Sequence, residues 1–171
     1  SKIKFHLKNV DIEDATIQLS RNEKGIFNYQ FLKDYFGSKK KKKKKPVHLY
    51  VDQVSLSNSS FKYDDNRKVR RTQGVDYFHI DATQINLLVQ SFKMDGMVFK
   101  GDIAQMSCYE KSGFQLDELV TSSLVSSDGI FLANLKIKSP GSTIASKKFN
   151  MLTTGYVDIL TFVDSVRFDA K

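Results

Sequence analysis

The sequence predicts a mainly β fold, an elongated and largely antiparallel sheet built from repeated strand pairs. Apolar residues recur at every second position in many segments, which is the period of a strand with one buried face. Turn-forming residues follow one another at short intervals, which is typical of neighbouring hairpins. The pattern favours only one short helix, near residues 28–37.

A repeated unit organises the first part of the chain. The segment from Val47 to Asn66 repeats the plan of the segment from Phe5 to Asn22. The alignment superposes four apolar pairs: Val10 and Val54, Ile12 and Leu56, Ile17 and Phe61, and Leu19 and Tyr63. Turn formers divide each copy, at Asp14-Ala15 and at Asn58-Ser59, so we interpret the unit as a strand pair.

A third and looser copy begins at Phe131, with Pro140-Gly141 as its turn. Repeated units that cannot bury their own apolar face are expected to stack as an array. An ordinary β-sandwich would show the same alternation, so both architectures remain open at this point.

The predicted helix follows the first unit. Asn28 can cap its amino end, apolar side chains recur at helical spacing, and Gly37 occupies the position of a left-handed stop. Seven lysines come next, before Pro46: Lys39, Lys40, Lys41, Lys42, Lys43, Lys44 and Lys45. Because adjacent like charges repel one another and bury nothing, we expect a flexible linker over residues 38–46.

The lysine run has a second interpretation, contact with an anionic surface such as lipid phosphate or a nucleic acid. Outside the run, 20 basic residues face 19 acidic ones, so the rest of the chain is nearly neutral. It shows no basic stripe with interleaved aromatic residues, and no nucleic-acid partner is expected.

The remaining elements follow from turn signals. A polar loop covers Asp64 to Gly74, and the strand that starts near Tyr77 should place Ile85, Leu87 and Val89 on one face. Further turns are predicted at Asp95-Gly96, at Ser112-Gly113 and from Ser126 to Gly129, with a weakly alternating strand over Phe149 to Lys171.

Catalytic and metal-binding patterns are not found. Cys108 is the single cysteine, and the histidines His6, His48 and His79 have no second ligand at a metal spacing. Carboxylates lie in predicted turns without a calcium-loop pattern, and the sequence has no nucleophile elbow and no phosphate-binding loop. We therefore predict a protein that is not an enzyme and needs no cofactor.

The apolar strand face is the remaining candidate site. In a sandwich, a second sheet would seal it, whereas in a curled array it would stay open as a lining for acyl chains. Periodicity does not separate these two possibilities. The candidate lining residues are Val10, Ile12, Leu49, Val51, Val54, Leu56, Phe61, Tyr63, Ile85, Leu87, Val89, Leu135 and Ile137.

One family resemblance bears on this choice. The helix NYQFLKDYFG, the Lys linker, VHLYVDQVSLSNSSFKYDD, GVDYFHI and CYEKSGFQLDEL resemble, in this order, the amino-terminal part of TamB-like proteins of the AsmA superfamily from Bacteroides-type bacteria. The resemblance covers about Phe5 to Phe168. It implies an elongated, curled β-trough in the periplasm, within a larger protein that is anchored in the inner membrane.

The same resemblance implies a function. Such proteins are implicated in moving phospholipid towards the outer membrane and in outer-membrane assembly with an Omp85-type barrel protein. We expect residues 1–171 to be one β-rich fragment of a larger chain, with the membrane anchor and the barrel-docking domain elsewhere. The family has no catalytic motif, so only the apolar face and the Lys linker carry over.

Overall fold

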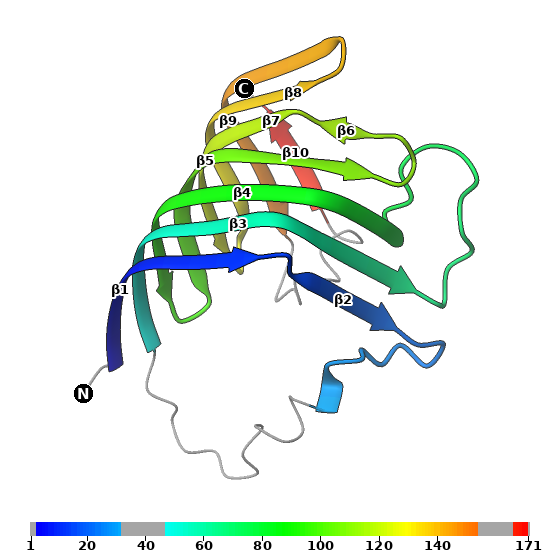
Figure 1. The fold of residues 1–171 in the computed structure, drawn as a ribbon, viewed down its shortest axis with the longest axis horizontal. Coiled ribbons are helices and arrows are strands. Elements are labelled where there is room, and N and C mark those ends of the chain that lie inside the picture. The colour runs from blue at the N-terminus through cyan, green and yellow to red at the C-terminus, as the bar shows by residue number, and fades with distance from the viewer. Residues whose placement is uncertain (1–2, 32–46, 154–165, 171) are drawn as a thin grey trace.

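The computed structural model describes residues 3–31, 47–153 and 166–170, and it confirms the mainly β prediction. Its ten strands form one open, curled sheet, shown in Figure 1. They are β1 (Ile3–Glu13), β2 (Thr16–Arg21), β3 (Val47–Asp65), β4 (His79–Asp95), β5 (Val98–Glu110), β6 (Gln115–Leu116), β7 (Glu118–Ser126), β8 (Gly129–Ser139), β9 (Ser142–Thr153) and β10 (Val166–Ala170).

Most of the predicted helix over residues 28–37 falls outside the described ranges. Gln30 and Phe31 begin a helical turn, and residues 32–37 are not described. Apart from these two residues, the strands account for the regular structure assigned to the described part of the chain. The Lys run from Lys39 to Lys45 and the linker over 38–46 also lie outside it, so both interpretations of the run stay predictions.

The sheet is mixed. Its strand order is β1-β3-β4-β5-β7-β8-β9-β10, with β2 also paired to β3 and β6 to β5. The pairs from β3 onward are antiparallel, as predicted. However, β1 and β2 run parallel to β3, which the expectation of neighbouring hairpins did not foresee. Parallel pairing needs a long connection, and 25 residues separate the end of β2 from the start of β3.

The sequence repeat reappears as the register of this parallel pairing. Val10 lies opposite Val54 and Ile12 opposite Leu56, the pairs that the repeat superposes. The same offset continues through β2, where Ile17 lies opposite Phe61 and Leu19 opposite Tyr63. The two copies therefore lie side by side, and equivalent apolar residues share one face of the sheet.

The interpretation of the first two copies as strand pairs is wrong, whereas the looser third copy is a strand pair, the β8–β9 hairpin. β3 is one continuous strand of 19 residues, and β1 and β2 follow each other along the same edge of it. Asp14 and Asn58, which resemble turn formers, have φ values of 50° and 45°. A left-handed residue inside a strand produces a bulge that bends the strand, whereas a hairpin would reverse it.

The sheet bends at two places. We call the first the polar bend and define it by three left-handed residues: Asp14 between β1 and β2, Asn58 in β3 and Gln84 in β4. Asn58 Nδ2 donates a hydrogen bond to Asp14 Oδ1 (2.6 Å), and Asn58 N donates to Asn86 Oδ1 (3.1 Å). Polar side chains therefore hold the bend across the sheet.

Ser59 completes the polar bend from inside the sheet. Its side chain is only 1% exposed. The hydroxyl accepts a hydrogen bond from Ala15 N (3.1 Å) and donates one to Ser57 O (3.0 Å). This hydroxyl satisfies two backbone groups where the regular ladder is interrupted.

The second bend, which we call the glycine bend, lies at Ser91 of β4 and Gly101 of β5. Ser91 has φ of 54°, and β4 contains one residue more than β5 between the flanking pairs Gln90–Asp102 and Lys93–Lys100. A Cβ atom on Gly101 would lie 2.8 Å from Val89 Cγ1. A side chain at position 101 would therefore force Val89 or one of the two strands to shift.

The predicted turns are mostly confirmed. Pro140-Gly141 joins β8 to β9, and Ser126 to Gly129 joins β7 to β8. The Ser112-Gly113 turn and the loop after Asp64 are present as well. The β4–β5 hairpin closes with the pair Asp95–Val98, so its loop residues are Gly96 and Met97, one position later than predicted.

Candidate functional site

The candidate site is one face of the sheet, which we call the apolar face. Residues directly opposite each other on paired strands share a face, so the register identifies its members. One row crosses seven strands and contains only apolar residues: Phe5, Leu49, Met94, Phe99, Val125, Ile130 and Met151. This row is the longest uninterrupted feature of the face.

Two further rows cross the strands beyond the glycine bend. One contains Val10, Val54, Val89, Ile103 and Thr121. The other contains Ile12, Leu56, Leu87 and Met106. Thr121 is the one polar member. It is only 3% exposed, and its hydroxyl is satisfied by donating to Ala133 O (2.9 Å).

The bulges keep these rows on the same face. Phe99 and Ile103 lie four residues apart on β5, which pairs regularly with β7 here, so both point to one side. Their partners on β4 are Met94 and Val89, which are five residues apart. The extra residue at the glycine bend therefore reverses the alternation of β4, and the apolar side chains stay together.

The same argument applies at the other bulges. Gln84 reverses the alternation of β4 between Ile85 and Ala82, and Asn134 reverses that of β8 between Leu132 and Leu135. All the predicted lining residues consequently fall on the apolar face: Val10, Ile12, Leu49, Val51, Val54, Leu56, Phe61, Tyr63, Ile85, Leu87, Val89, Leu135 and Ile137. Their contact with a lipid stays a prediction.

Burial identifies the apolar face as the inner side of the curl. In a single curved layer, side chains crowd one another on the concave side and spread apart on the convex side. The six buried apolar side chains within strands all belong to the apolar face: Val51, Tyr63, Ala82, Ile85, Leu116 and Leu135. The single-layer sheet therefore buries its apolar residues mainly against each other.

The apolar face has no second sheet over it within the described residues, because every strand belongs to the one sheet. Several of its members are open to solvent at the β1–β2 edge and on β9. Leu7 is 44% exposed, Ile12 41%, Ile17 47% and Ile144 59%. A sandwich with a sealed core is not what the described strands form.

The opposite face is largely polar across the first strands. Its row beside Phe5 begins with His6, Tyr50, Lys93 and Lys100. His6 Nε2 lies 2.8 Å from Asp52 Oδ1, and the Lys93 ammonium lies 5.3 Å from the centre of the Tyr50 ring. The row becomes apolar only at Leu124 and Phe131.

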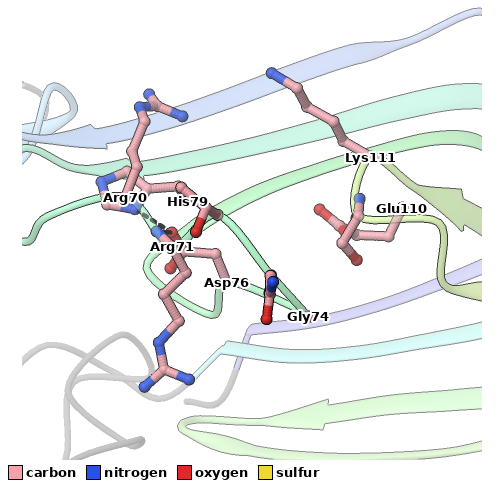
Figure 2. A pocket seen from close by; sticks show the side chains of 10 residues that line it. Arg70, Arg71, Gly74, Asp76, His79, Glu110 and Lys111 are labelled. Atoms are coloured by element: carbon pink, nitrogen blue, oxygen red, sulfur yellow. Dashed lines mark hydrogen bonds and ion pairs between the residues drawn. The ribbon is translucent and has the colours of Figure 1, made fainter.

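A separate polar pocket of about 410 Å³ lies where the β3–β4 loop meets the β5–β6 turn. Figure 2 shows Asp76 and His79 on one side of it and Glu110 on the other, with the side chains of Arg71 and Lys111 extending away. His79 Nδ1 lies 2.8 Å from Asp76 Oδ2, and both residues are buried. Sequence reasoning missed this pocket because its residues come from distant segments.

Internal hydrogen bonds already engage both carboxylates of the pocket. Burial raises the pKa of Asp76, but hydrogen bonds from Arg71 N, from His79 and from Phe78 N outweigh it and hold this pKa below its usual value. Burial likewise raises the pKa of Glu110, but hydrogen bonds from Ser112 and from Asp81 N outweigh burial and hold this pKa below its usual value. These ionised groups orient the two loops, which is a structural task.

Metal binding and thiol chemistry can be considered for the described residues. Among the described residues, no three His, Cys, Asp or Glu side chains are grouped so as to hold a metal ion. Burial, and then the Glu110 charge, raise the pKa of the Cys108 thiol, which makes it a poorer nucleophile. The described ranges contain no helix that could cross a bilayer.

Comparison with protein families, with curated proteins and with solved structures finds no match to this chain. The fold and the candidate site define an architectural class: a single-layer, curled, mixed β-sheet with one apolar face.

Proposed function

We propose that this chain is a non-enzymatic segment that binds the acyl chains of phospholipids along its apolar face. The observation that carries the proposal is the row from Phe5 to Met151, which is apolar at every strand that it crosses. It lies on the inner side of a curled layer, and no second described sheet covers it. An acyl chain needs such an apolar area and the exclusion of water rather than specific polar partners.

The length of the row supports a path rather than a closed pocket. Six steps between strands of roughly 4.8 Å each make a row about 29 Å long. The hydrocarbon core of a bilayer is about 30 Å thick and holds two leaflets, so one acyl chain occupies about 15 Å of depth. The row is thus about twice as long as one chain requires, and it runs to the open edge at β1.

The biological setting of this proposal comes from the resemblance to TamB-like proteins. In that setting, the segment belongs to a protein anchored in the inner membrane of a Gram-negative cell, and its periplasmic apolar face passes phospholipid between the inner and outer membranes. Support for outer-membrane assembly would involve an Omp85-type barrel protein bound by other parts of the parent chain.

The first experiment is mass spectrometry of organic extracts from the chain purified out of bacterial membranes without added lipid. Near-stoichiometric phospholipid, relative to a control domain of similar size and charge, supports the proposal. Absence of lipid above the control contradicts it.

A matched pair of variants tests the face itself. Leu56→Glu with Leu87→Glu places two carboxylates on the apolar face, whereas Ser55→Glu with Leu88→Glu places two on the opposite face of the same strands. We expect the first variant to lose retained lipid and the second to keep it, with circular dichroism verifying that both are folded. Equal retention by the two folded variants would contradict the proposal.

A second candidate function is a protein-interaction module that adds a partner's strand without binding lipid. The free edge of β1 favours it, because Phe5 at this edge is 55% exposed. This function predicts that extracts contain no lipid while a partner strand protects β1 from hydrogen exchange.

A further inference from the structure

The free edge of β1 is an open strand surface in the described part of the chain. β1 pairs with β3 on one side, and no described strand pairs with its other side. Phe5 is 55% exposed, Leu7 44% and Ile12 41%, because each has a neighbour in its row on one side only. An edge of this kind presents unpaired backbone N–H and C=O groups to any compatible strand.

Charge is segregated along this edge. The first half of β1 carries Lys4 and Lys8, and the second half carries Asp11 and Glu13. Charged residues on an edge strand usually prevent pairing with another chain. Here, however, an antiparallel second copy would bring the basic half of each strand against the acidic half of the other, whereas a parallel copy in register would oppose like charges.

One antiparallel register gives complementary contacts on both faces of the sheet. When Phe5 lies opposite Ile12 and Leu7 opposite Val10 of the second copy, apolar-face residues meet only apolar-face residues. The same register places Lys4 opposite Glu13 and His6 opposite Asp11 on the other face. The two-fold axis then passes between Lys8 and Asn9, where the β1–β3 ladder is already irregular, since Lys8 and Asp52 are not paired.

A competing register would extend the contact into β2. It would pair Phe5 with Ile17 and Val10 with Ile12, and it would also keep apolar residues together. However, it sets Asp11 against Asp11 of the other copy on the two-fold axis, which opposes two like charges directly. Charge complementarity therefore selects the shorter register.

We propose that β1 pairs in this antiparallel register with β1 of a second copy of the chain. The two sheets then form one continuous sheet about a two-fold axis perpendicular to it, and the two apolar faces join on the same side. Such a contact is isologous, because each copy contributes the same surface. The occupant of the free edge is thus a second copy of this chain.

Zero-length carbodiimide cross-linking followed by peptide mass spectrometry tests the register directly. Within one copy, Lys4 and Glu13 are nine residues apart on a strand, or about 30 Å, so an amide between them can form only between copies. We expect this Lys4–Glu13 link in a dimer band and a dimer in analytical ultracentrifugation. A chain that is monomeric at high micromolar concentration, or a dimer without this link, overturns the proposal.

Charge reversal supplies the matched test. Lys4→Glu replaces two attractive contacts in the dimer by two repulsive ones, and we expect dimerisation to weaken roughly tenfold. Glu13→Lys should weaken it similarly, and the double variant should restore it. Lys100→Glu, an exposed reversal in the middle of the sheet, is the control and should change nothing. Failure of the double variant to recover dimerisation, while all variants stay folded by circular dichroism, also overturns the proposal.

Discussion

The polar bend and the glycine bend both keep apolar side chains on one face where the sheet curves, but different interactions stabilise them. At both places a left-handed residue reverses the alternation of β4 and keeps apolar side chains on one face. Hydrogen bonds of Asn58 and Ser59 hold the polar bend across the sheet. At the glycine bend, Gly101 leaves room for Val89. A curled single layer thus uses polar bonding at one bend and close packing at the other.

Gly101→Ala should have the largest effect on this comparison. Its Cβ would lie 2.8 Å from Val89 Cγ1, so the Val89 side chain, β4 or β5 must shift, and we expect a loss of about 1–3 kcal/mol in the free energy of unfolding. Denaturant unfolding measures it, and Lys100→Ala on the same strand is the control. The double variant with Val89→Ala should lose less than the sum of the two single losses, because the two sites are in contact. Additive losses would mean that close packing does not hold this bend.

Ser59→Ala should cause the next largest loss in the free energy of unfolding. It removes the acceptor of Ala15 N and the donor to Ser57 O in a site that is 1% exposed, which should cost about 1–2 kcal/mol. Ser60→Ala is a matched control, because the Ser60 hydroxyl makes an exposed hydrogen bond to the Thr16 hydroxyl (3.2 Å) and satisfies no buried backbone group. Equal losses in chemical denaturation of the two variants would show that the buried hydroxyl is not what holds the polar bend.

Two substitutions of Asn58 distinguish the cost of backbone strain from the loss of side-chain hydrogen bonds. Asn58→Ala and Asn58→Gly both remove the bond to Asp14, but only glycine adopts a φ of 45° without cost. The alanine variant should therefore be less stable than the glycine variant by about 1 kcal/mol, the usual cost of a left-handed L-residue. Thermal unfolding of the two proteins measures the difference, and a difference near zero would mean that the strand relaxes out of the bulge.

Acid should weaken the fold as the pH falls to about 4 and below, and Asp65 at the end of β3, beyond the polar bend, should contribute to this loss. The hydrogen bond from the Arg67 side chain holds the pKa of Asp65 below its usual value, against the opposing effect of burial. A carboxyl whose pKa is lower in the folded state stabilises the fold above its unfolded pKa, and this contribution is lost as the pH falls through the folded pKa. Asp65→Asn should flatten the acid limb of a pH titration of stability, and an unchanged limb would contradict this assignment.

The apolar pattern predicted which residues share one face better than it predicted the strand order. Leu49 and Val51 have odd numbers, Val54 and Leu56 have even numbers, and Phe61 and Tyr63 have odd numbers again, yet all six belong to one face. Strict alternation would have divided them between two faces. Apolar side chains mark the buried face even where bulges interrupt the period of two.

Local sequence could not distinguish a bulge from a turn. Asp14-Ala15 and Asn58-Ser59 have the composition of hairpin turns, because Asn and Asp tolerate the left-handed region in either setting. Pro140-Gly141 predicted a true hairpin correctly, since proline fixes φ at the first turn position and glycine supplies a φ of 72° at the second. The parallel pairing of β1 with β3 depends on long-range contacts that no short motif encodes.

The members of the long row were missed for a related reason. Met94, Phe99, Val125, Ile130 and Met151 join it only because successive hairpins set their register. A shift of one residue in the predicted turn at Asp95-Gly96 changes the partner of every residue on β5. The polar pocket depends on still more distant segments, since Asp76 and Glu110 meet only after β4 and β5 have paired.

The parallel register has a consequence for the order of folding. The β8–β9 and β4–β5 hairpins close loops of two residues, whereas each β1–β3 contact joins residues 44 positions apart. The entropic cost of closing a loop increases with the length of the loop, so non-local pairs form after local ones. β1 should therefore be the last long strand to join the sheet and the first to leave it, and amide exchange should be faster in β1 than in β4.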